Sequence, residues 1–580
     1  METYICDHAQ LDWKGDTPYS KHYEDIYWNR AGATQEKKHV FIKPLMQHLS
    51  VRCPNQQVTV CELGFGFGIN CLLAAQYWRY QPANSRLNLV SIERHPVGPL
   101  ILRKFLNQHN FYHTENLMRQ YPLPYRGQHV IWLADNIRLL LIFNDVETAL
   151  AGLDAAVDFW FLDGFSPKSN EAMWQDSLFR KMFARSRPGA GIATYTAASH
   201  VRRGLEDAGF KTRKKLGFAE KKEMLQAVAP GKWRAAKIKP YSVTIIGSGL
   251  VGLYCSEALE KRGIVPKIIS SGIGASEIPQ LAVKPQIAVR AEARYRYSLM
   301  AFHYMKSSPG YHHTGLKWFA RNSEEKVRLR KIADQFPNAI MFYHPEGMIE
   351  VAEAGWLSYD KLRASISTTI TVDEISSLTA TSGGWTLIGR NKQYWADRVI
   401  LATGFDKQLL HPELQIRTVH GQAISVGTAR VDQILNGDVS VLPTDAGRSV
   451  ISGTYARRNS LDANPEDTKK LLASALKLVS FDDSNISIYT GVRAVTRDRL
   501  PIIGAAPIWR KLDTVKRTND IKAHAAGLYY CVGFGSRGAT HARLSAENLV
   551  AKMFDEPAAL DAKQQQMLSP ARFLLRDRAY

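Results

Sequence analysis

The sequence predicts an α/β protein with two consecutive nucleotide-binding domains. Two stretches carry this prediction, VTVCELGFGFG at 58–68 and VTIIGSGLVG at 243–252. Each reads as a short apolar strand, a glycine-rich turn and the start of a helix, which together present backbone N–H groups to a phosphate or nucleoside. At roughly 150 residues per domain, 580 residues leave room for both domains.

In the first half, acidic residues follow the predicted strands. Glu93 ends the strand RLNLVSIE, and Asp135 and Asp163 end the strands in VIWLADN and VDFWFLDGFSP. A carboxylate at such a strand end accepts hydrogen bonds from ribose hydroxyls. The spacing E-x-G-x-G-x-G resembles motif I of S-adenosylmethionine-dependent methyltransferases. The residues expected to bind S-adenosylmethionine are Glu62, Gly64, Gly66, Gly68, Glu93 and Asp135.

In the second half, the glycines follow the dinucleotide pattern G-x-G-x-x-G. Two later glycine turns, in DRVILATGFD at 397–406 and GLYYCVGFGSRG at 527–538, favour FAD over a nicotinamide cofactor, which needs no such distant turns. Ser270 stands where a ribose-binding acid is usual, so we expect weaker FAD binding that a glutamate at 270 would tighten. The expected FAD-binding residues are Gly247, Gly249, Gly252, Ser270, Gly404, Gly533 and Gly535.

A basic segment, 211–239, separates the two halves. It holds ten Lys or Arg against two Glu, and Pro230 and Gly231 interrupt it. We therefore predict domains at 1–235 and 236–580 and expect residues 1–238 to work alone. The chain has 75 Lys and Arg against 54 Asp and Glu, a formal net charge of +21, which indicates a polyanionic partner. The basic segment is a candidate RNA-binding surface.

Other sequence features narrow the class of protein. The six cysteines include no CxxC pair, so we expect neither a zinc site nor a disulfide framework, and no metal. The chain has no apolar run of the ~20 residues that span a bilayer. These features predict a cytoplasmic protein that does not enter a membrane.

Taken together, the motifs CELGFGFGINCL, FLDGFSPKSNEAMW, GVRAVTRDRLPIIG and GFGSRGATHARLSAE resemble those of the MnmC family of bifunctional tRNA-modifying proteins. The resemblance covers nearly the whole chain. It implies a Rossmann-like class I methyltransferase followed by an FAD-binding α/β domain with an antiparallel-sheet substrate subdomain, as in D-amino-acid and glycine oxidases.

The resemblance also implies two reactions on the wobble uridine of tRNA. The second half would oxidatively remove the carboxymethyl group of 5-carboxymethylaminomethyl-(2-thio)uridine, and the first half would methylate the resulting amine. By the same resemblance, Arg493 and Arg537 are candidates for binding the substrate carboxylate. Asp163, in DGFSP, is the candidate catalytic residue that accepts an N–H bond and directs the amine lone pair.

Three alternatives stay open on the sequence alone. The fused enzyme acts on a small-molecule amine, the flavin half is inactive, or the chain is an RNA-binding scaffold with neither activity. Glu277 and Leu281, where the family tends to have glycine, underlie the second alternative. The sequence leaves the tRNA species, protein partners and oligomeric state undetermined.

Overall fold

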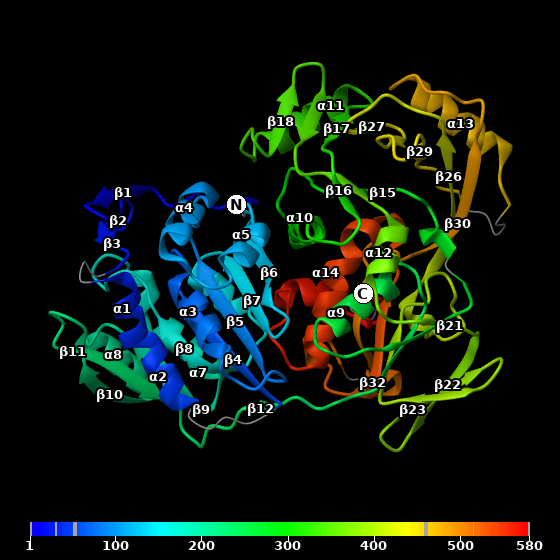
Figure 1. The fold of residues 1–580 in the computed structure, drawn as a ribbon. Coiled ribbons are helices and arrows are strands. Elements are labelled where there is room, and N and C mark those ends of the chain that lie inside the picture. The colour runs from blue at the N-terminus through cyan, green and yellow to red at the C-terminus, as the bar shows by residue number, and fades with distance from the viewer. Residues whose placement is uncertain are drawn as a thin grey trace. The chain divides into compact units, whose positions relative to one another are not determined.

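A computed structural model describes residues 3–28, 32–49, 55–272, 274–456, 462–513 and 515–577 (Figure 1). The chain forms two compact units. The N-terminal unit contains Ile5–Pro240 and Ala551–Ala562, and the C-terminal unit contains Met1–Tyr4, Tyr241–Val550 and Lys563–Tyr580. Each unit therefore includes a short segment from the other end of the chain, so a single boundary between residues 235 and 236 does not separate the two units.

The N-terminal unit is built on a nine-stranded sheet. All eight residues of its central strand β4 (Gln56–Leu63) are buried, as expected for a parallel strand covered on both faces. The sheet order is β10-β11-β9-β8-β4-β5-β7-β6, with β12 also paired to β4. The other strands are β5 (Arg86–Glu93), β6 (Gly127–Ala134), β7 (Ile137–Phe143), β8 (Val157–Leu162), β9 (Ser186–Thr194), β10 (Lys211–Leu216), β11 (Glu223–Val228) and β12 (Ala236–Lys237).

Helices and a small sheet complete this unit. A three-stranded sheet of β1 (Leu11–Lys14), β2 (Thr17–Ser20) and β3 (Asp25–Ile26) precedes the helices. The helices are α1 (Ala33–Lys37), the π-helix η1 (Lys38–Ile42), α2 (Lys43–His48), α3 (Ile69–Trp78), α4 (Pro99–His109), α5 (Thr114–Gln120), α6 (Val146–Gly152), the 3-10 helix η2 (Glu171–Trp174), α7 (Asp176–Arg185) and α8 (Ser199–Asp207).

β6, the strand that precedes Asp135, runs antiparallel to β7, so Asp135 does not have the position expected from the sequence. This strand contains VIWLA and lies at the sheet edge, whereas β7 is parallel to β5. Asp135 therefore lies in the β6–β7 turn, near the amino end of β5. The carboxyl end of the parallel strand is instead at Phe143, followed by Asn144 and Asp145. An apolar run does not disclose strand direction, because both orientations bury the same side chains.

The C-terminal unit contains a parallel sheet and a larger, mostly antiparallel one. The first has the order β21-β14-β13-β25-β32-β31, with only β31 antiparallel, and the second β18-β19-β17-β27-β28-β29-β26-β30. The first comprises β13 (Val243–Ile246), β14 (Lys267–Ser270), β21 (Ile370–Val372), β25 (Arg398–Leu401), β31 (Ile502–Pro507) and β32 (His524–Val532). The second comprises β17 (Leu316–Phe319), β18 (Met341–His344), β19 (Met348–Val351), β26 (Arg417–Val426), β27 (Ile434–Asn436), β28 (Ser440–Val441), β29 (Ser449–Ser452) and β30 (Ser487–Val495).

Two three-stranded sheets and the helices complete the C-terminal unit. The small sheets are β15 (Leu281–Val283), β20 (Gly355–Leu357) and β16 (Tyr311–His313), and β22 (Ile375–Thr381), β23 (Gly384–Gly389) and β24 (Gln393–Ala396). The α-helices are α9 (Leu250–Glu260), α10 (Ala293–Met305), α11 (Ser323–Ala333), α12 (Tyr359–Ser365), α13 (Pro465–Leu476), α14 (Gly538–Met553), α15 (Ala562–Leu568) and α16 (Arg572–Asp577). The 3-10 turns are η3 (Gly274–Ser276), η4 (Pro412–Leu414), η5 (Trp509–Lys511), η6 (Thr518–Asp520) and η7 (Gly535–Arg537).

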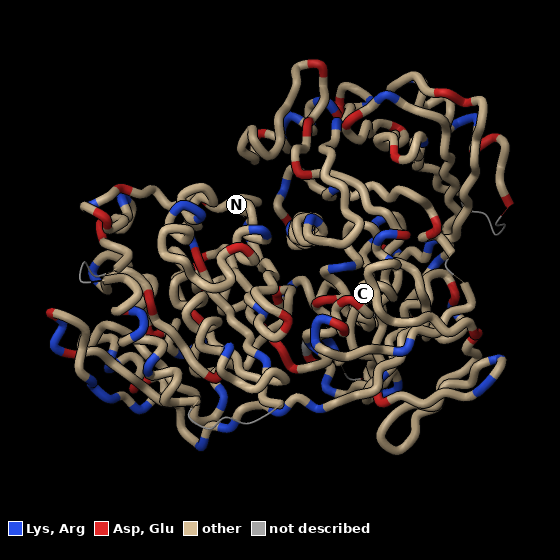
Figure 2. Tube along the Cα trace, in the orientation of Figure 1, with Lys and Arg blue, Asp and Glu red and all other residues tan. Residues whose placement is uncertain are grey.

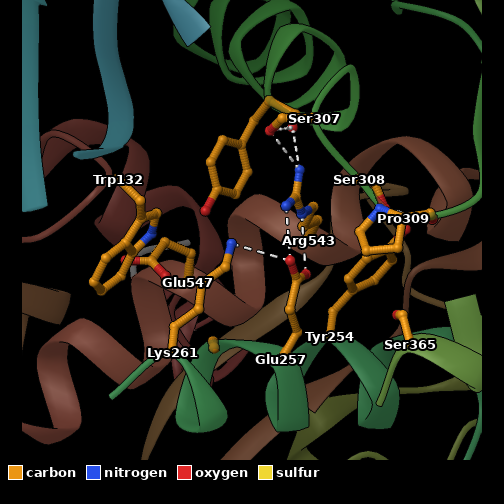
Figure 3. Close-up of polar contacts among 12 residues, drawn as sticks. Trp132, Tyr254, Glu257, Lys261, Ser307, Ser308, Pro309, Ser365, Arg543 and Glu547 are labelled. Carbon is orange, nitrogen blue, oxygen red and sulfur yellow. Dashed lines mark hydrogen bonds and ion pairs between the residues drawn. The ribbon is translucent and has the colours of Figure 1, made fainter. Parts of the chain in front are cut away.

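Buried ion pairs join α9 to α14. Arg543 donates to Glu257 through Nε at 3.0 Å and Nη2 at 2.7 Å, and Lys261 reaches the same carboxylate at 3.0 Å (Figure 3). Arg262 and Glu547 form a second pair at 2.8 Å, with side chains 0% and 1% exposed. Because a buried pair is costly to break, these contacts fix the C-terminal end of α9 against the middle of α14.

The segment 551–562 belongs to the N-terminal unit through specific hydrogen bonds. Arg138 Nη1 donates to the carbonyl of Pro557 at 2.9 Å, and Gln57 Nε2 to that of Phe554 at 3.1 Å. Arg86 and Glu556 form an ion pair at 3.4 Å. Arg138, Gln57 and Glu556 are all buried. The segment thus satisfies polar groups that the first 240 residues bury.

Candidate functional sites

A cavity of about 370 Å³ lies at the carboxyl ends of β4, β5, β7 and β8 in the N-terminal unit. Gly64, Gly66, Glu62, Glu93 and Asp163 all line it, as the sequence predicted. This edge of an open α/β sheet is where such folds bind ligands. Asp135 is not among the described residues that line the cavity, whereas Asn144 and Asp145 are.

Asp163 makes three short polar contacts in the wall of this cavity. Lys37 Nζ lies 2.7 Å from its Oδ1 and 2.5 Å from its Oδ2, and Asn70 Nδ2 donates to Oδ2 at 2.7 Å. Burial raises the pKa of Asp163, while the Lys37 charge opposes that rise. The arrangement holds a carboxylate in one orientation with lone pairs left for a further donor.

The predicted nucleoside-binding acids are already held by the protein. Glu93 accepts backbone N–H bonds from Gly66 and His95, each at 2.8 Å. Glu62 accepts from Ser91 Oγ at 2.6 Å and Cys71 Sγ at 3.2 Å, and burial raises its pKa to about 7. These bonds hold both carboxylates in one orientation at the cavity wall.

Two glycines of the motif allow the close packing that shapes this cavity. A Cβ at Gly64 would lie 2.6 Å from the Asp163 carbonyl oxygen, so only glycine allows the two loops to approach so closely. Gly68 has φ 73° at the start of α3, and a Cβ there would lie 2.6 Å from the Phe65 ring. Gly68 itself is not among the described lining residues.

Aromatic rings and a lysine form another part of this cavity wall. The Phe165 ring stacks on Tyr23 with centroids 4.7 Å apart, and Tyr195 OH donates to the Gly164 carbonyl at 2.9 Å. Lys221 Nζ lies 4.0 Å from the Tyr195 ring centroid. Flat aromatic walls beside a cation suit a base and its phosphate. Lys221 belongs to the turn between β10 and β11, so the basic hairpin reaches this cavity.

In the C-terminal unit, a larger cavity of about 700 Å³ is lined by the glycine-rich turns of all three predicted motifs. Gly247, Gly249, Gly404, Gly533 and Gly535 line it. Gly252 lies one turn into α9, where a Cβ would be 1.9 Å from the Gly247 carbonyl oxygen. This close helix–strand packing is the role of the third glycine in dinucleotide folds, so the residues present fit FAD.

Ser270 lines this cavity, but its hydroxyl is already fully used. It donates to the Gly272 carbonyl at 2.6 Å and accepts from Ser248 Oγ at 2.9 Å and Gly272 N at 3.3 Å. A hydroxyl has one proton and two lone pairs, so nothing is left for a ribose. The structure therefore gives Ser270 a loop-closing role, in place of the ribose contact expected from the sequence.

Arg493, on β30, lines the same cavity. Its Nη1 donates to the Thr454 carbonyl at 3.0 Å, and burial lowers its pKa. A Cβ at Gly421, on the neighbouring strand β26, would lie 2.4 Å from the guanidinium carbon. Gly421 thus leaves the space that the Arg493 side chain occupies.

The structure does not bring Arg537 to this cavity. Its Nη1 donates to the Arg499 carbonyl at 2.8 Å, and it is not among the described lining residues. Burial and the neighbouring Arg294 and Arg499 lower its pKa. The turn η7 directs the arginine away although its neighbours Gly535 and Ser536 line the cavity.

Sequence reasoning missed Lys37, Asn70 and Lys284. Lys37 lies in EKKHVF, which resembles a solvated helix face, and is brought to Asp163 by the short helix α1. Asn70 is the second residue of α3, and little in the sequence indicates that its amide side chain lines the cavity. Lys284 follows β15 and lines the C-terminal cavity. Only the folding of distant segments places these side chains.

Comparison with known proteins agrees with the two sites. A family model described as S-adenosyl-L-methionine-dependent methyltransferase matches residues 109–230, and one described as FAD dependent oxidoreductase matches residues 242–553. The MnmC bifunctional protein of Dichelobacter nodosus is 30% identical over 100% of this chain and 98% of its own length. The chain belongs to the MnmC family. The MnmC of Ralstonia nicotianae is 29% identical over 97% of this chain and 96% of its own.

Membership of the MnmC family makes the chain an enzyme with methyltransferase and oxidoreductase domains that use S-adenosyl-L-methionine and FAD. Among solved structures, glycine oxidase from Geobacillus kaustophilus has a TM-score of 0.44 and 19% identity, covering 56% of this chain and 98% of its own. Among the described residues, no helix is long and apolar enough to cross a membrane, and no cluster of three or more His, Cys, Asp or Glu could hold a metal ion.

Proposed function

We propose that this enzyme modifies the wobble uridine of tRNA in two steps, one in each unit. The C-terminal unit converts 5-carboxymethylaminomethyl-(2-thio)uridine to the aminomethyl form, and the N-terminal unit methylates that amine to give 5-methylaminomethyl-(2-thio)uridine. Support comes from the curated relatives, which are named tRNA 5-methylaminomethyl-2-thiouridine biosynthesis bifunctional proteins. The observation that carries the proposal is that each unit holds a separate cavity lined by its own nucleotide motif.

In the oxidation, the carbon between the amine and the carboxylate loses a hydride and the nitrogen loses a proton. The resulting imine takes up water and separates into glyoxylate and the aminomethyl base. FAD, when bound, supplies the two-electron acceptor. The protein's task is to bind the carboxylate and hold the C–H bond in line, which Arg493 suits through its planar pair of N–H donors.

In the methylation, the amine nitrogen needs a free lone pair. A primary alkylamine is mostly protonated at pH 7, since the comparable lysine pKa is about 10.4. Asp163 accepts an N–H bond from the amine and directs the lone pair toward the methyl group of S-adenosylmethionine. Glu62, Glu93 and the Gly64–Gly66 loop bind the methyl donor, and Asn144 and Asp145 take the place expected for Asp135.

The tRNA partner is supported by a line of basic side chains. Lys211, Arg213 and Lys215 alternate along the edge strand β10, are exposed, and by the two-residue repeat of a strand share one face of it. Several Lys and Arg positions gather in the region of β10 (Figure 2). The same hairpin carries Lys221 into the methyltransferase cavity. A phosphate backbone bound along β10 would bring a flipped base near that cavity.

The test uses purified full-length protein and tRNA that carries the carboxymethylaminomethyl base. Without S-adenosylmethionine we expect the aminomethyl nucleoside to accumulate, and with it the methylaminomethyl nucleoside. Asp163→Asn should lower methyl transfer by about 10²-fold or more while oxidation continues. Arg493→Ala should do the converse. Oxidation of free glycine derivatives at rates unaffected by tRNA would contradict the proposal and favour a small-molecule substrate.

A further inference from the structure

Lys284 places an amine in the wall of the C-terminal cavity. Its backbone is fixed to the first turn of α14, because Thr540 Oγ1 accepts from Lys284 N at 3.3 Å and donates to Lys284 O at 3.1 Å. Its Nζ donates to Asn436 Oδ1 and, at 3.1 Å, to Ser440 Oγ. Both ends of the residue are therefore held, and the side chain has one defined position.

The charge of Lys284 is not neutralised by the protein. Its two partners are a neutral amide and a neutral hydroxyl, and among the described residues no carboxylate forms an ion pair with Lys284 or with Arg493. Burial lowers the pKa of Lys284 to about 8 and also lowers that of Arg493. Two buried cations without anions are unfavourable, and a bound anion would relieve the cost for both.

The two cations are held by the same sheet. Asn436 and Ser440 belong to β27 and β28, and Ser440 pairs with Ser452 of β29. Thr454, which binds Arg493, follows two residues later. The acidic lining residues instead follow the parallel strands β14, β21 and β25, and they are Glu277, Asp373, Glu374 and Asp406.

Because different sheets hold the cations and the acidic residues, we can ask which anion the cations bind, the FAD pyrophosphate or the substrate carboxylate. The FAD pyrophosphate is expected at the Gly247–Gly252 turn, which belongs to the parallel sheet. Arg493 is on β30 of the antiparallel sheet, and the Lys284 ammonium is bound by Asn436 and Ser440 of the same sheet. Both cations are therefore held apart from that turn and can bind a different group. The oxidation substrate carries one anionic group next to its reacting carbon, a carboxylate, and that group suits the two cations that line this cavity.

We propose that Lys284 is a second carboxylate-binding residue of the oxidase site, which acts together with Arg493 on N-carboxymethyl amines. This inference rests on the proposed oxidation. Arg493 binds both carboxylate oxygens through its planar guanidinium, and Lys284 adds a point charge to one of them. The pair makes the site select substituents that end in a carboxylate over neutral ones of the same size.

The experiment measures binding of methoxyacetate to the FAD-loaded full-length protein. Methoxyacetate has the carboxylate and methylene of the substrate but an ether oxygen in place of the oxidisable amine. Flavin absorbance gives the Kd, and calorimetry at pH 8 in two buffers of different ionisation enthalpy gives proton uptake. We expect proton uptake on binding, because burial lowers the pKa of Lys284 to about 8 and an anion beside the ammonium would raise it again.

Three variants separate this role from a structural one. Lys284→Met should raise the Kd for methoxyacetate about 10-fold or more and abolish the proton uptake, since one charge-assisted bond is lost. Lys284→Arg keeps the charge and should stay within a few-fold of the wild-type Kd without proton uptake. Lys331→Met, which removes an exposed lysine of α11, is the matched control and should leave both quantities unchanged.

An unchanged Kd in Lys284→Met, or no proton uptake by the wild-type protein, overturns the inference. If Lys284→Met does not retain FAD, the wild-type proton uptake and the Lys284→Arg protein still decide the question. Failure of the proposed function appears differently. Methoxyacetate binding would then depend on Lys284 while the carboxymethylaminomethyl tRNA is not oxidised.

Discussion

Lys37 and Asp163, 126 positions apart in the sequence, form a buried ion pair at 2.5 Å in the wall of the N-terminal cavity. The pair places a positive charge directly against a buried carboxyl group. Burial alone raises the pKa of Asp163, and the neighbouring ammonium counteracts this. The proposed acceptor of the amine N–H bond, which follows β8, thus depends on a residue of helix α1.

Replacing Lys37 should shift the pH dependence of methyl transfer. In Lys37→Met the opposing charge is gone, so the pKa of Asp163 rises further and the carboxylate is lost at a higher pH. We expect the acid limb of the kcat profile to move up by about 1–3 pH units, the usual effect of one close opposite charge. Lys37→Arg should remain near wild type. A lower kcat with an unmoved limb would indicate a purely structural role.

Glu62 should make the stability of the N-terminal unit fall as the pH rises. Its folded pKa of about 7 lies above the unfolded value of about 4.3, so the folded state binds the proton more tightly between these values. Ionisation through this range costs about 4 kcal/mol of stability. Glu62→Gln stays neutral and should lose this dependence.

Hydrogen exchange in β4, corrected for intrinsic rates, at pH 5 and pH 8 measures this effect. Exposed Glu220→Gln is the control, with the wild-type pH dependence expected. If Glu62→Gln and wild type lose the same protection between the two pH values, the buried carboxyl is not the cause.

The exposed basic side chains of β10 should contribute to tRNA affinity. Changing Lys211, Arg213 and Lys215 together to Gln should weaken binding and reduce the slope of log K against log salt by about two to three, close to one per lost phosphate contact. As the control, Lys43→Gln, Lys104→Gln and Arg180→Gln remove three exposed charges elsewhere on this unit. Equal slopes for the two triple variants would show that only net charge matters.

Residues 1–240 should fold less stably when the segment 551–562 is missing. The fragment loses the Pro557 carbonyl bound by Arg138, the Phe554 carbonyl bound by Gln57, and the ion pair of Arg86 with Glu556. At about 1 kcal/mol for each buried bond, we expect the Tm to drop by roughly 5 °C or more. This revises the expectation that residues 1–238 are self-sufficient.

The comparison is between residues 1–240 alone and the same residues joined to 551–562 through a flexible linker. A third protein, with Glu556→Ala in the joined segment, should have an intermediate Tm. Identical melting of all three would mean that the segment contributes nothing to this unit.

Ser270→Glu should weaken FAD binding, contrary to the sequence-based expectation. The Ser270 hydroxyl makes three hydrogen bonds within its loop, which a larger carboxylate cannot reproduce. We expect a lower Tm and a higher Kd for FAD, by about 1–3 kcal/mol in binding. Ser270→Ala should show a smaller loss. Tighter FAD binding at an unchanged Tm would instead support the ribose contact expected from the sequence.

The α/β character, the two nucleotide motifs, the order of the domains and the family could all be predicted from the sequence. These features depend on local patterns, in which a strand, glycines with positive φ and a helix follow each other within about 20 residues. Gly252 is an example, because the close approach that it permits is to Gly247, five residues earlier. The acid at Asp163 was found in the same way, at the end of an apolar strand.

Which side chains from distant segments lie together in the two cavities depends on the three-dimensional fold. Strand direction moved Asp135 away from the cavity and brought Asn144 and Asp145 to it, and a turn directed Arg537 elsewhere. Lys37 and Lys284 have no local pattern, because their partners come from segments more than 100 residues away. Electrostatic roles of this kind depend on distance and burial, and linear spacing records neither.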